Sequence, residues 1–171
     1  MSKFIAPPVS VLLVAACAAY QPGPSATAQL LATQGNAVTG LVQFTQKGDK
    51  VLVVGEIQGL KPNAVHGFHV HEKGDCSSGD GMSTGGHFNP TGKPHGSHDQ
   101  NEHHAGDFPS LNADASGAAR FSFETNAISV GSGVADVLGR GLIVHRDPDD
   151  FKTQPTGNSG PRVACAAITK S

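Results

Sequence analysis

The chain has 171 residues, of which 37% are hydrophobic, and a formal net charge of −2, so it can bury one sizeable core. It has no tryptophan and no cluster of lysine or arginine, and therefore lacks the basic stripe with stacking aromatic residues that is typical of nucleic-acid-binding proteins. A single domain with no nucleic-acid partner is expected.

The N-terminus is typical of an export signal. A lysine precedes an apolar stretch at residues 4–16 that is too short to span a bilayer comfortably. Val14-Ala15-Ala16-Cys17 is similar to a bacterial lipobox, in which the cysteine is lipidated and begins the mature protein. The alternative is an ordinary cleaved signal peptide, because two prolines interrupt the apolar run. We predict a signal peptide at 1–16, a lipidated Cys17 with a flexible tether at 17–26, and a lipoprotein anchored to a membrane in the periplasm or cell envelope.

Short strands are the main signal beyond the tether. Alternating or compact apolar patterns occur at residues 37–46, 51–57, 120–125, 141–145 and 162–168. Glycine and proline separate these runs and no helical period is sustained, which favours an all-β sandwich or barrel with Greek-key crossings. We place this domain at residues 27–171.

Two connections between the predicted strands are long, residues 73–108 and 146–161. Loops of such length in a compact domain are usually functional. With Cys17 assigned to lipidation, Cys76 and Cys165 remain, and an even pair in an exported protein favours a disulfide. Such a bond would tie the first long loop to the last strand; two free buried thiols are the alternative.

The histidines before the first long loop lie on a predicted strand. His69 and His71 would project from the same face, whereas His66 and Phe68 would point the other way. Two ligands would thus lie on one rigid element. An exposed polar face would explain the pair if it stood alone, but more histidines follow. His66, on the apolar face, is expected to be a hydrogen-bonded core residue.

The first long loop carries three more candidate histidines and a carboxylate: His87, His95, His104 and Asp107. Three histidines and one carboxylate form a closed tetrahedral set typical of structural zinc. Zinc would also order a loop that has no secondary structure of its own. His103 competes with His104, which we prefer because it forms a tight turn with Asp107. His98 lies in a polar stretch and is expected to be solvated.

Six separated segments carry a resemblance to a known family. They are Gly67–Glu72, Gly86–Pro90, Pro94–Gly96, His104–Asp107, Leu142–His145 and Gly157–Cys165. In this order they closely resemble copper,zinc superoxide dismutases of the exported bacterial kind, from about residue 26 to Ile168. The resemblance implies an enzyme that converts superoxide to dioxygen and hydrogen peroxide by alternate reduction and reoxidation of copper. It also implies an eight-stranded Greek-key β-barrel or sandwich, immunoglobulin-like, with two long functional loops.

The resemblance further implies which residues bind the two metal ions. Copper would be bound by His69, His71, His87 and His145, and zinc by His87, His95, His104 and Asp107. His87 would therefore bridge the ions, and this division agrees with the preference of copper for imidazole and the suitability of a carboxylate for zinc.

Two more residues have roles implied by the resemblance, and a third cation lies near them in the second long loop. Asp149 would link His69 to His95 and orient both rings. Arg162 would attract and orient superoxide near copper, a task suited to a permanently charged guanidinium. Lys152 is the only additional cation in its part of the second loop, and its role in steering stays open.

Three other functions fit the sequence less well. A copper-delivery domain of the same fold commonly lacks some ligands or the arginine, and all are present here. A cupin-like oxygenase would need a second motif that is absent, and the glycines at 131–133 lack the strand-to-helix context of a dinucleotide site. A homodimer is compatible with the sequence.

Overall fold

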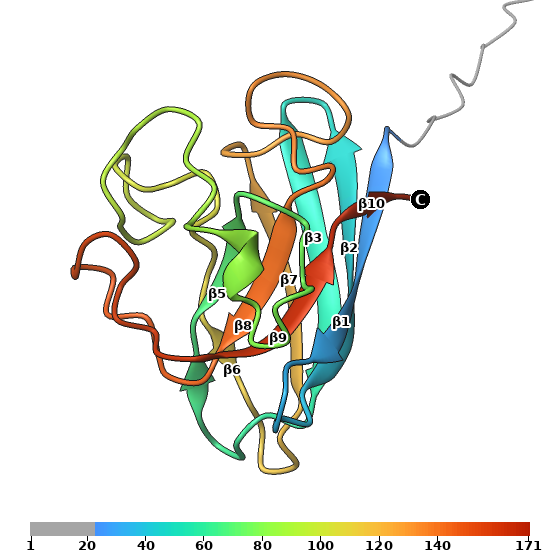
Figure 1. Ribbon diagram of the computed structural model, residues 1–171. Coiled ribbons are helices and arrows are strands. Elements are labelled where there is room, and N and C mark those ends of the chain that lie inside the picture. Colours follow the sequence, from blue (N-terminus) through green and yellow to red (C-terminus); the bar gives the residue numbers. More distant parts are fainter. Residues whose placement is uncertain (1–22) are drawn as a thin grey trace, which may run out of the picture.

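The computed structural model describes residues 23–171 (Figure 1), so the predictions for the signal peptide and Cys17 lie outside the described residues. This part forms the strands β1 (Ser25–Ala32), β2 (Thr39–Lys47), β3 (Lys50–Gln58), β4 (Val65–His66), β5 (Phe68–His71), β6 (Leu111–Asn112), β7 (Ala119–Thr125), β8 (Gly141–His145), β9 (Arg162–Ala167) and β10 (Thr169–Lys170). One 3-10 helix, η1, covers Met82–Thr84. Among the helices of residues 23–171, none has the length and apolar character needed to cross a membrane.

Eight of these strands form one antiparallel sheet. Their order is β5-β8-β9-β1-β2-β3-β7, with β10 also paired to β1, while β4 and β6 form a separate pair. Strands distant in sequence, such as β1 and β9 or β3 and β7, lie side by side, which is the pattern of Greek-key crossings. The all-β prediction is confirmed.

The sheet begins earlier than the sequence indicated. β1 starts at Ser25, inside the expected tether, and Ser25 pairs with Thr45 of β2. Its buried positions are mostly alanines, whose small side chains gave a weak apolar signal. All five predicted runs correspond to strands, namely β2, β3, β7, β8 and β9.

Aromatic packing closes the curled sheet. Phe68 of β5 and Phe121 of β7, from opposite ends of the strand order, have ring centroids 5.3 Å apart. Phe108 packs on Phe68 at 5.6 Å and on Phe44 at 6.5 Å. The two ends of the sheet therefore face one another across one apolar core, which gives the barrel its interior.

Both long loops lie on the side of the barrel that carries β5 and β8 (Figure 1). The first returns to β5 twice, through isolated bridges that pair His71 with His87 and His69 with Asp107. It is also tied to β9 by the disulfide between Cys76 and Cys165, as predicted. The second long loop, residues 146–161, contains no strand. The barrel thus presents two anchored loops beside one pair of strands.

Candidate metal centre

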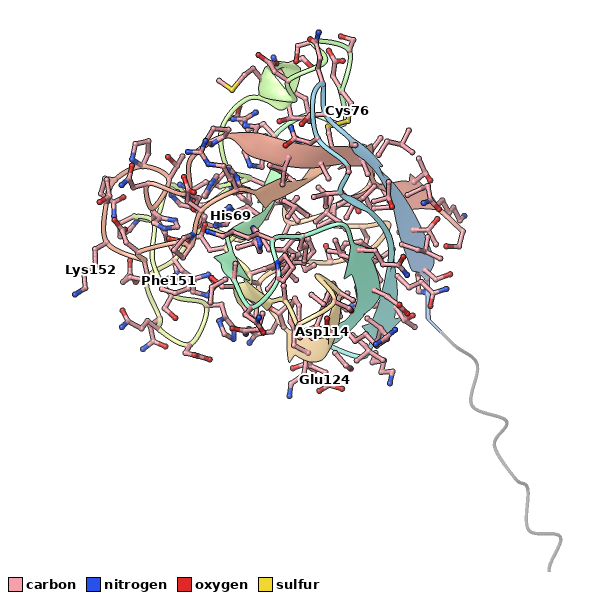
Figure 2. All side chains as sticks on the ribbon, turned by 90° about the horizontal axis from the view of Figure 1, so that it is seen from below. His69, Cys76, Asp114, Glu124, Phe151 and Lys152 are labelled. Atoms are coloured by element: carbon pink, nitrogen blue, oxygen red, sulfur yellow. A yellow bond between two sulfur atoms is a disulfide. The ribbon has the colours of Figure 1, made fainter. Side chains whose placement is uncertain are left out.

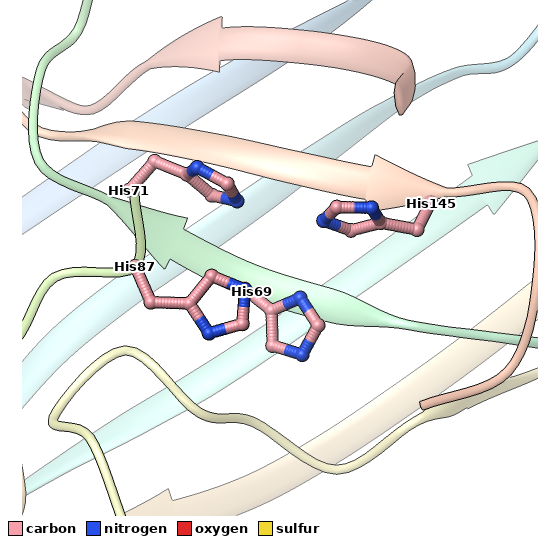
Figure 3. A group of neighbouring side chains, drawn as sticks. All are labelled: His69, His71, His87 and His145. Carbon is pink, nitrogen blue, oxygen red and sulfur yellow. The ribbon is translucent and has the colours of Figure 1, made fainter. Parts of the chain in front are cut away.

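Four histidines from β5, β8 and the first long loop converge on one space (Figure 3). They are His69, His71, His87 and His145, all buried, and each offers a ring nitrogen within 4.8 Å of the others. The alternation of β5 turns His69 and His71 away from Phe68 and Val70, which pack in the core. Pairing of β5 with β8 then brings His145 beside them. The sheet itself assembles most of this group.

A second buried group contains His87, His95, His104 and Asp107, again within 4.8 Å of one another. The Oδ1 atom of Asp107 lies 2.9 Å from Nδ1 of His87, 3.0 Å from Nδ1 of His95 and 3.4 Å from Nδ1 of His104. The other oxygen, Oδ2, accepts hydrogen bonds from the backbone N–H of His104 and Gly96 at 2.8 and 3.1 Å. Oδ1 is therefore the oxygen that faces all three rings.

Six inward nitrogens of these residues are buried without a hydrogen-bond partner: His69 Nδ1, His71 Nε2, His87 Nε2, His95 Nδ1, His104 Nδ1 and His145 Nε2. An unpaired buried polar atom is costly, and a cation on each group would satisfy these atoms. The donor sets also fit the two metals, since four imidazoles suit copper and three imidazoles with a carboxylate suit zinc.

The outer nitrogens of several rings are held by protein oxygens. Nδ1 of His71 donates to the carbonyl of Gly85 at 3.0 Å, and Nδ1 of His145 donates to the carbonyl of Gly160 at 3.0 Å. When the outer nitrogen carries the proton, the inner one keeps its lone pair for a metal. The hydrogen bonds thus set both the orientation and the tautomer of these rings.

Asp149 links the two groups through the outer ring nitrogens of His69 and His95. Its Oδ2 accepts a hydrogen bond from Nε2 of His69 at 2.7 Å, and its Oδ1 accepts one from Nε2 of His95 at 2.9 Å. Burial raises the pKa of Asp149, but the hydrogen bonds from His69 and His95 outweigh it and hold that pKa well below its usual range. A Cβ at Gly157 would lie only 1.8 Å from Oδ1 of Asp149, and its φ is +66°, so only glycine fits over this bridge.

Burial controls the protonation of the rings. It lowers the pKa of His87 to about 4 and that of His145 to about 3, so both are neutral at pH 7. His95 differs: burial lowers its pKa, but the adjacent carboxylates of Asp107 and Asp149 outweigh this and raise the pKa to about 9. Two ionised carboxylates beside one ring make this a place that favours a positive charge.

Arg162 lies beside the first group. As the first residue of β9 it pairs with His145 across the sheet. Its guanidinium donates to the carbonyl of Gly81 at 2.7 Å, to Oγ1 of Thr84 at 2.8 Å and to the carbonyl of Gly85 at 2.8 Å. Gly85 also accepts from His71, so one carbonyl connects the arginine to a ring of the group. The cation is thus held at a defined place next to the histidines.

The remaining histidines lie outside both groups. His66 is buried and its Nδ1 bonds to the carbonyl of His145 at 2.9 Å, in agreement with its predicted core role. His103 bonds through Nδ1 to the carbonyl of His104 at 2.7 Å, and only His104 joins a group. The side chain of His98 is 26% exposed and pairs with Asp99 at 3.0 Å.

Lys152 is exposed on the second long loop, at the outer edge of the side of the molecule where His69 lies (Figure 2). Sequence reasoning missed three groups that hold these histidines in place. The carbonyls of Gly85 and Gly160 accept hydrogen bonds from two of the rings, and the side chain of Gln154 bonds the backbone of His95. The position of a backbone carbonyl cannot be predicted from residue type, apart from the glycine-rich turns in which these carbonyls lie. Gln154 had no histidine or acidic neighbour to draw attention to it.

Comparison with known proteins gives consistent matches. The family model described as copper/zinc superoxide dismutase (SODC) matches residues 38–168. A protein named superoxide dismutase [Cu-Zn], from Paramecium bursaria Chlorella virus 1, is 42% identical over 137 residues, which cover 77% of this chain and 72% of the viral protein. A crystal structure of the clock protein EA4 is similar with a TM-score of 0.78 and 39% identity, over 88% of this chain and 96% of that chain.

Proposed function

This chain belongs to the copper/zinc superoxide dismutase family, and on that premise we propose a role for each residue of its metal centre. It is an enzyme that converts two superoxide anions and two protons to dioxygen and hydrogen peroxide, with copper and zinc as cofactors. In our proposal copper is bound by His69, His71, His87 and His145, and zinc by His87, His95, His104 and Asp107. His87 is the bridge between them.

One observation carries this assignment: the two ring nitrogens of His87 face different groups. Nδ1 lies 2.9 Å from Asp107, whereas Nε2 is buried without a hydrogen-bond partner on the side of the four histidines. Only a residue between two sites needs both nitrogens directed at ligand sets. No other histidine of residues 23–171 belongs to both groups.

The protein's part in the reaction follows from these positions. Bound copper supplies reversible one-electron chemistry, and bound zinc supplies a fixed charge that is not redox active. Nε2 of His87 is the atom that can hold a proton and return it to the reduced product. Because Asp107 and the surrounding loop fix the other side of the ring, that proton is held at a constant place beside the copper ligands.

Arg162 attracts and orients the substrate. Its three hydrogen bonds to Gly81, Thr84 and Gly85 hold a permanent positive charge beside His71 and His145. A delocalised guanidinium suits a small anion better than a flexible ammonium group does. Replacement of Arg162 by alanine should slow the reaction with superoxide while copper content stays the same. Loss of copper together with activity would contradict a role in substrate approach.

The experiment that tests the function combines metal analysis with turnover. A preparation with both metals present in stoichiometric amounts should consume superoxide and release hydrogen peroxide at half the molar rate. A fully copper-loaded protein without superoxide-dependent turnover would instead favour a copper-delivery domain on the same fold.

We also propose that the enzyme is exported and anchored as a lipoprotein of the bacterial type. The signal-like residues 1–16 and the lipobox ending at Cys17 support this, and the Cys76–Cys165 disulfide suits an oxidising compartment. The variant Cys17→Ala should move the protein from the membrane fraction to the soluble fraction. A wild-type protein already found in the soluble fraction would exclude the anchor.

A further inference from the structure

The second long loop holds His95 by its backbone as well as by its ring. Oε1 of Gln154 accepts a hydrogen bond from the backbone N–H of His95 at 2.8 Å, and Nε2 of Gln154 donates to the carbonyl of His95 at 2.9 Å. Asp149, of the same loop, accepts from Nε2 of the His95 ring at 2.9 Å. Three contacts from one loop thus leave Nδ1 as the unpartnered nitrogen of this residue.

His95 depends on this loop more than the other residues of the two groups do. The backbone of His69 and His71 belongs to the β5–β8 ladder, and His104 is held by the carboxylate of Asp107. Within residues 23–171, the backbone of His95 has hydrogen bonds to Gln154 alone. The position of its ring therefore rests on a side chain from a distant part of the sequence.

Gln154 lies in a segment that is stabilised by its own internal hydrogen bonds. Oδ1 of Asp150 accepts hydrogen bonds from the backbone N–H of Lys152 and Thr153 at 2.9 and 2.8 Å, and the N–H of Gly157 donates to the carbonyl of Thr153 at 2.7 Å. Gln154 itself is exposed. Fixing an exposed side chain at both of its polar atoms costs conformational entropy. We interpret these contacts as a restraint on the backbone of His95, because burial of the glutamine cannot offset that cost.

We infer that Gln154 is a positioning residue for the zinc-binding half of the site: it holds the backbone of His95 so that Nδ1 faces Asp107. Since coupling between two binding equilibria is reciprocal, zinc in turn orders the loop that carries Lys152. This inference rests on the proposed assignment of His95 to zinc.

The test measures zinc and copper affinity by competition with chelators on metal-free protein. Gln154→Ala removes both hydrogen bonds to the backbone of His95, together with one to the carbonyl of Lys152 at 3.4 Å. It should weaken zinc binding by about tenfold, with copper affinity changed less than about twofold. Gln154→Glu keeps an acceptor for the N–H of His95 and should restore part of the loss. The matched control is Gln100→Ala, because Gln100 is an exposed glutamine of the first long loop with no side-chain hydrogen bond in the described part of the chain.

Two further readouts separate positioning from general stability. Cobalt placed in the zinc site gives a visible spectrum that reports coordination geometry, and this spectrum should change in Gln154→Ala and return toward wild type in Gln154→Glu. Zinc should also protect the amides of residues 146–161 from hydrogen exchange in the wild-type protein. That protection should be smaller in Gln154→Ala.

The outcomes separate failure of this inference from failure of the proposed site. His95→Ala should abolish zinc binding at this site; if it keeps wild-type zinc affinity, the assignment of His95 is wrong and the inference fails with it. If His95→Ala loses zinc but Gln154→Ala keeps wild-type affinity and cobalt spectrum, only the inference is overturned. Equal losses of copper and zinc affinity in Gln154→Ala would also overturn it, because they would show a general loss of structure.

Discussion

Replacement of Asp149 by asparagine should weaken zinc binding strongly while leaving the fold intact. The carboxylate accepts one hydrogen bond from each of two rings, at 2.7 Å from Nε2 of His69 and 2.9 Å from Nε2 of His95. An amide has one accepting oxygen, so its NH2 group must face one of these ring N–H groups. That ring then keeps a repulsive contact, or moves its proton to Nδ1, the nitrogen that would bind the metal.

The size of the effect follows from what is lost. Residues that orient a metal ligand typically contribute 10- to 100-fold in affinity, or about 1.4 to 2.7 kcal/mol. The zinc side should lose more, because the β5–β8 ladder still holds the backbone of His69 whereas His95 lies in a loop. We therefore expect a zinc dissociation constant at least about tenfold higher, with a smaller change for copper.

The assay is competition between metal-free protein and a chelator of known affinity, for each metal separately. Asp99→Asn is the matched control, because Asp99 also pairs with a histidine, His98 at 3.0 Å, but at the surface. It should leave both affinities unchanged. Wild-type zinc affinity in Asp149→Asn would refute the argument that the tautomer of His95 is set by this carboxylate.

Three other outcomes are expected. His145→Ala, which removes a member of one group only, should abolish copper binding and turnover but keep zinc; retained turnover would contradict the copper assignment. Reduction of the Cys76–Cys165 disulfide, with its sequence separation of 89, should lower the free energy of unfolding by about 4 to 5 kcal/mol in a urea titration, and an unchanged midpoint would count against it. In the metal-free protein, burial lowers the pKa of His87 to about 4 and that of His145 to about 3. As the pH falls below about 6.5, these histidines are protonated in the unfolded chain before they are protonated in the folded protein, so the free energy of unfolding should decrease. His95, with its pKa raised to about 9, has the opposite effect: it adds stability that is lost as the pH rises toward 9. A Tm that does not vary between pH 7 and pH 4 would exclude the predicted effect of His87 and His145.

The parts of the site that could be predicted from sequence are those with local geometry. His69 and His71 share a face because a strand has a period of two, and His104 precedes Asp107 by one turn, so both pairs are visible in the sequence alone. His145 could be placed with them only through resemblance to a family. Its position depends on the pairing of β8 with β5, a long-range contact that no local pattern reveals.

The fold shows the same division. Strands with large apolar side chains, such as those around Phe44 or Phe121, stand out from their polar neighbours. β1 does not, because two of its three buried positions are the small residues Ala26 and Ala28. Gln154 was missed for a different reason: its partners are the backbone atoms of His95, and any residue type has those atoms.

The two groups also differ in how much chain each must close. The outermost members of the zinc group, His87 and Asp107, are 107 − 87 = 20 residues apart, whereas His69 and His145 of the copper group are 145 − 69 = 76 residues apart. Loop-closure entropy then favours the shorter span by about 1.2 kcal/mol, but His95 of the zinc group also depends on hydrogen bonds to Asp149 and Gln154, which follow β8 in the chain. Both groups are therefore complete only when β8 and the loop that follows it have taken their places, although the zinc group closes much less chain.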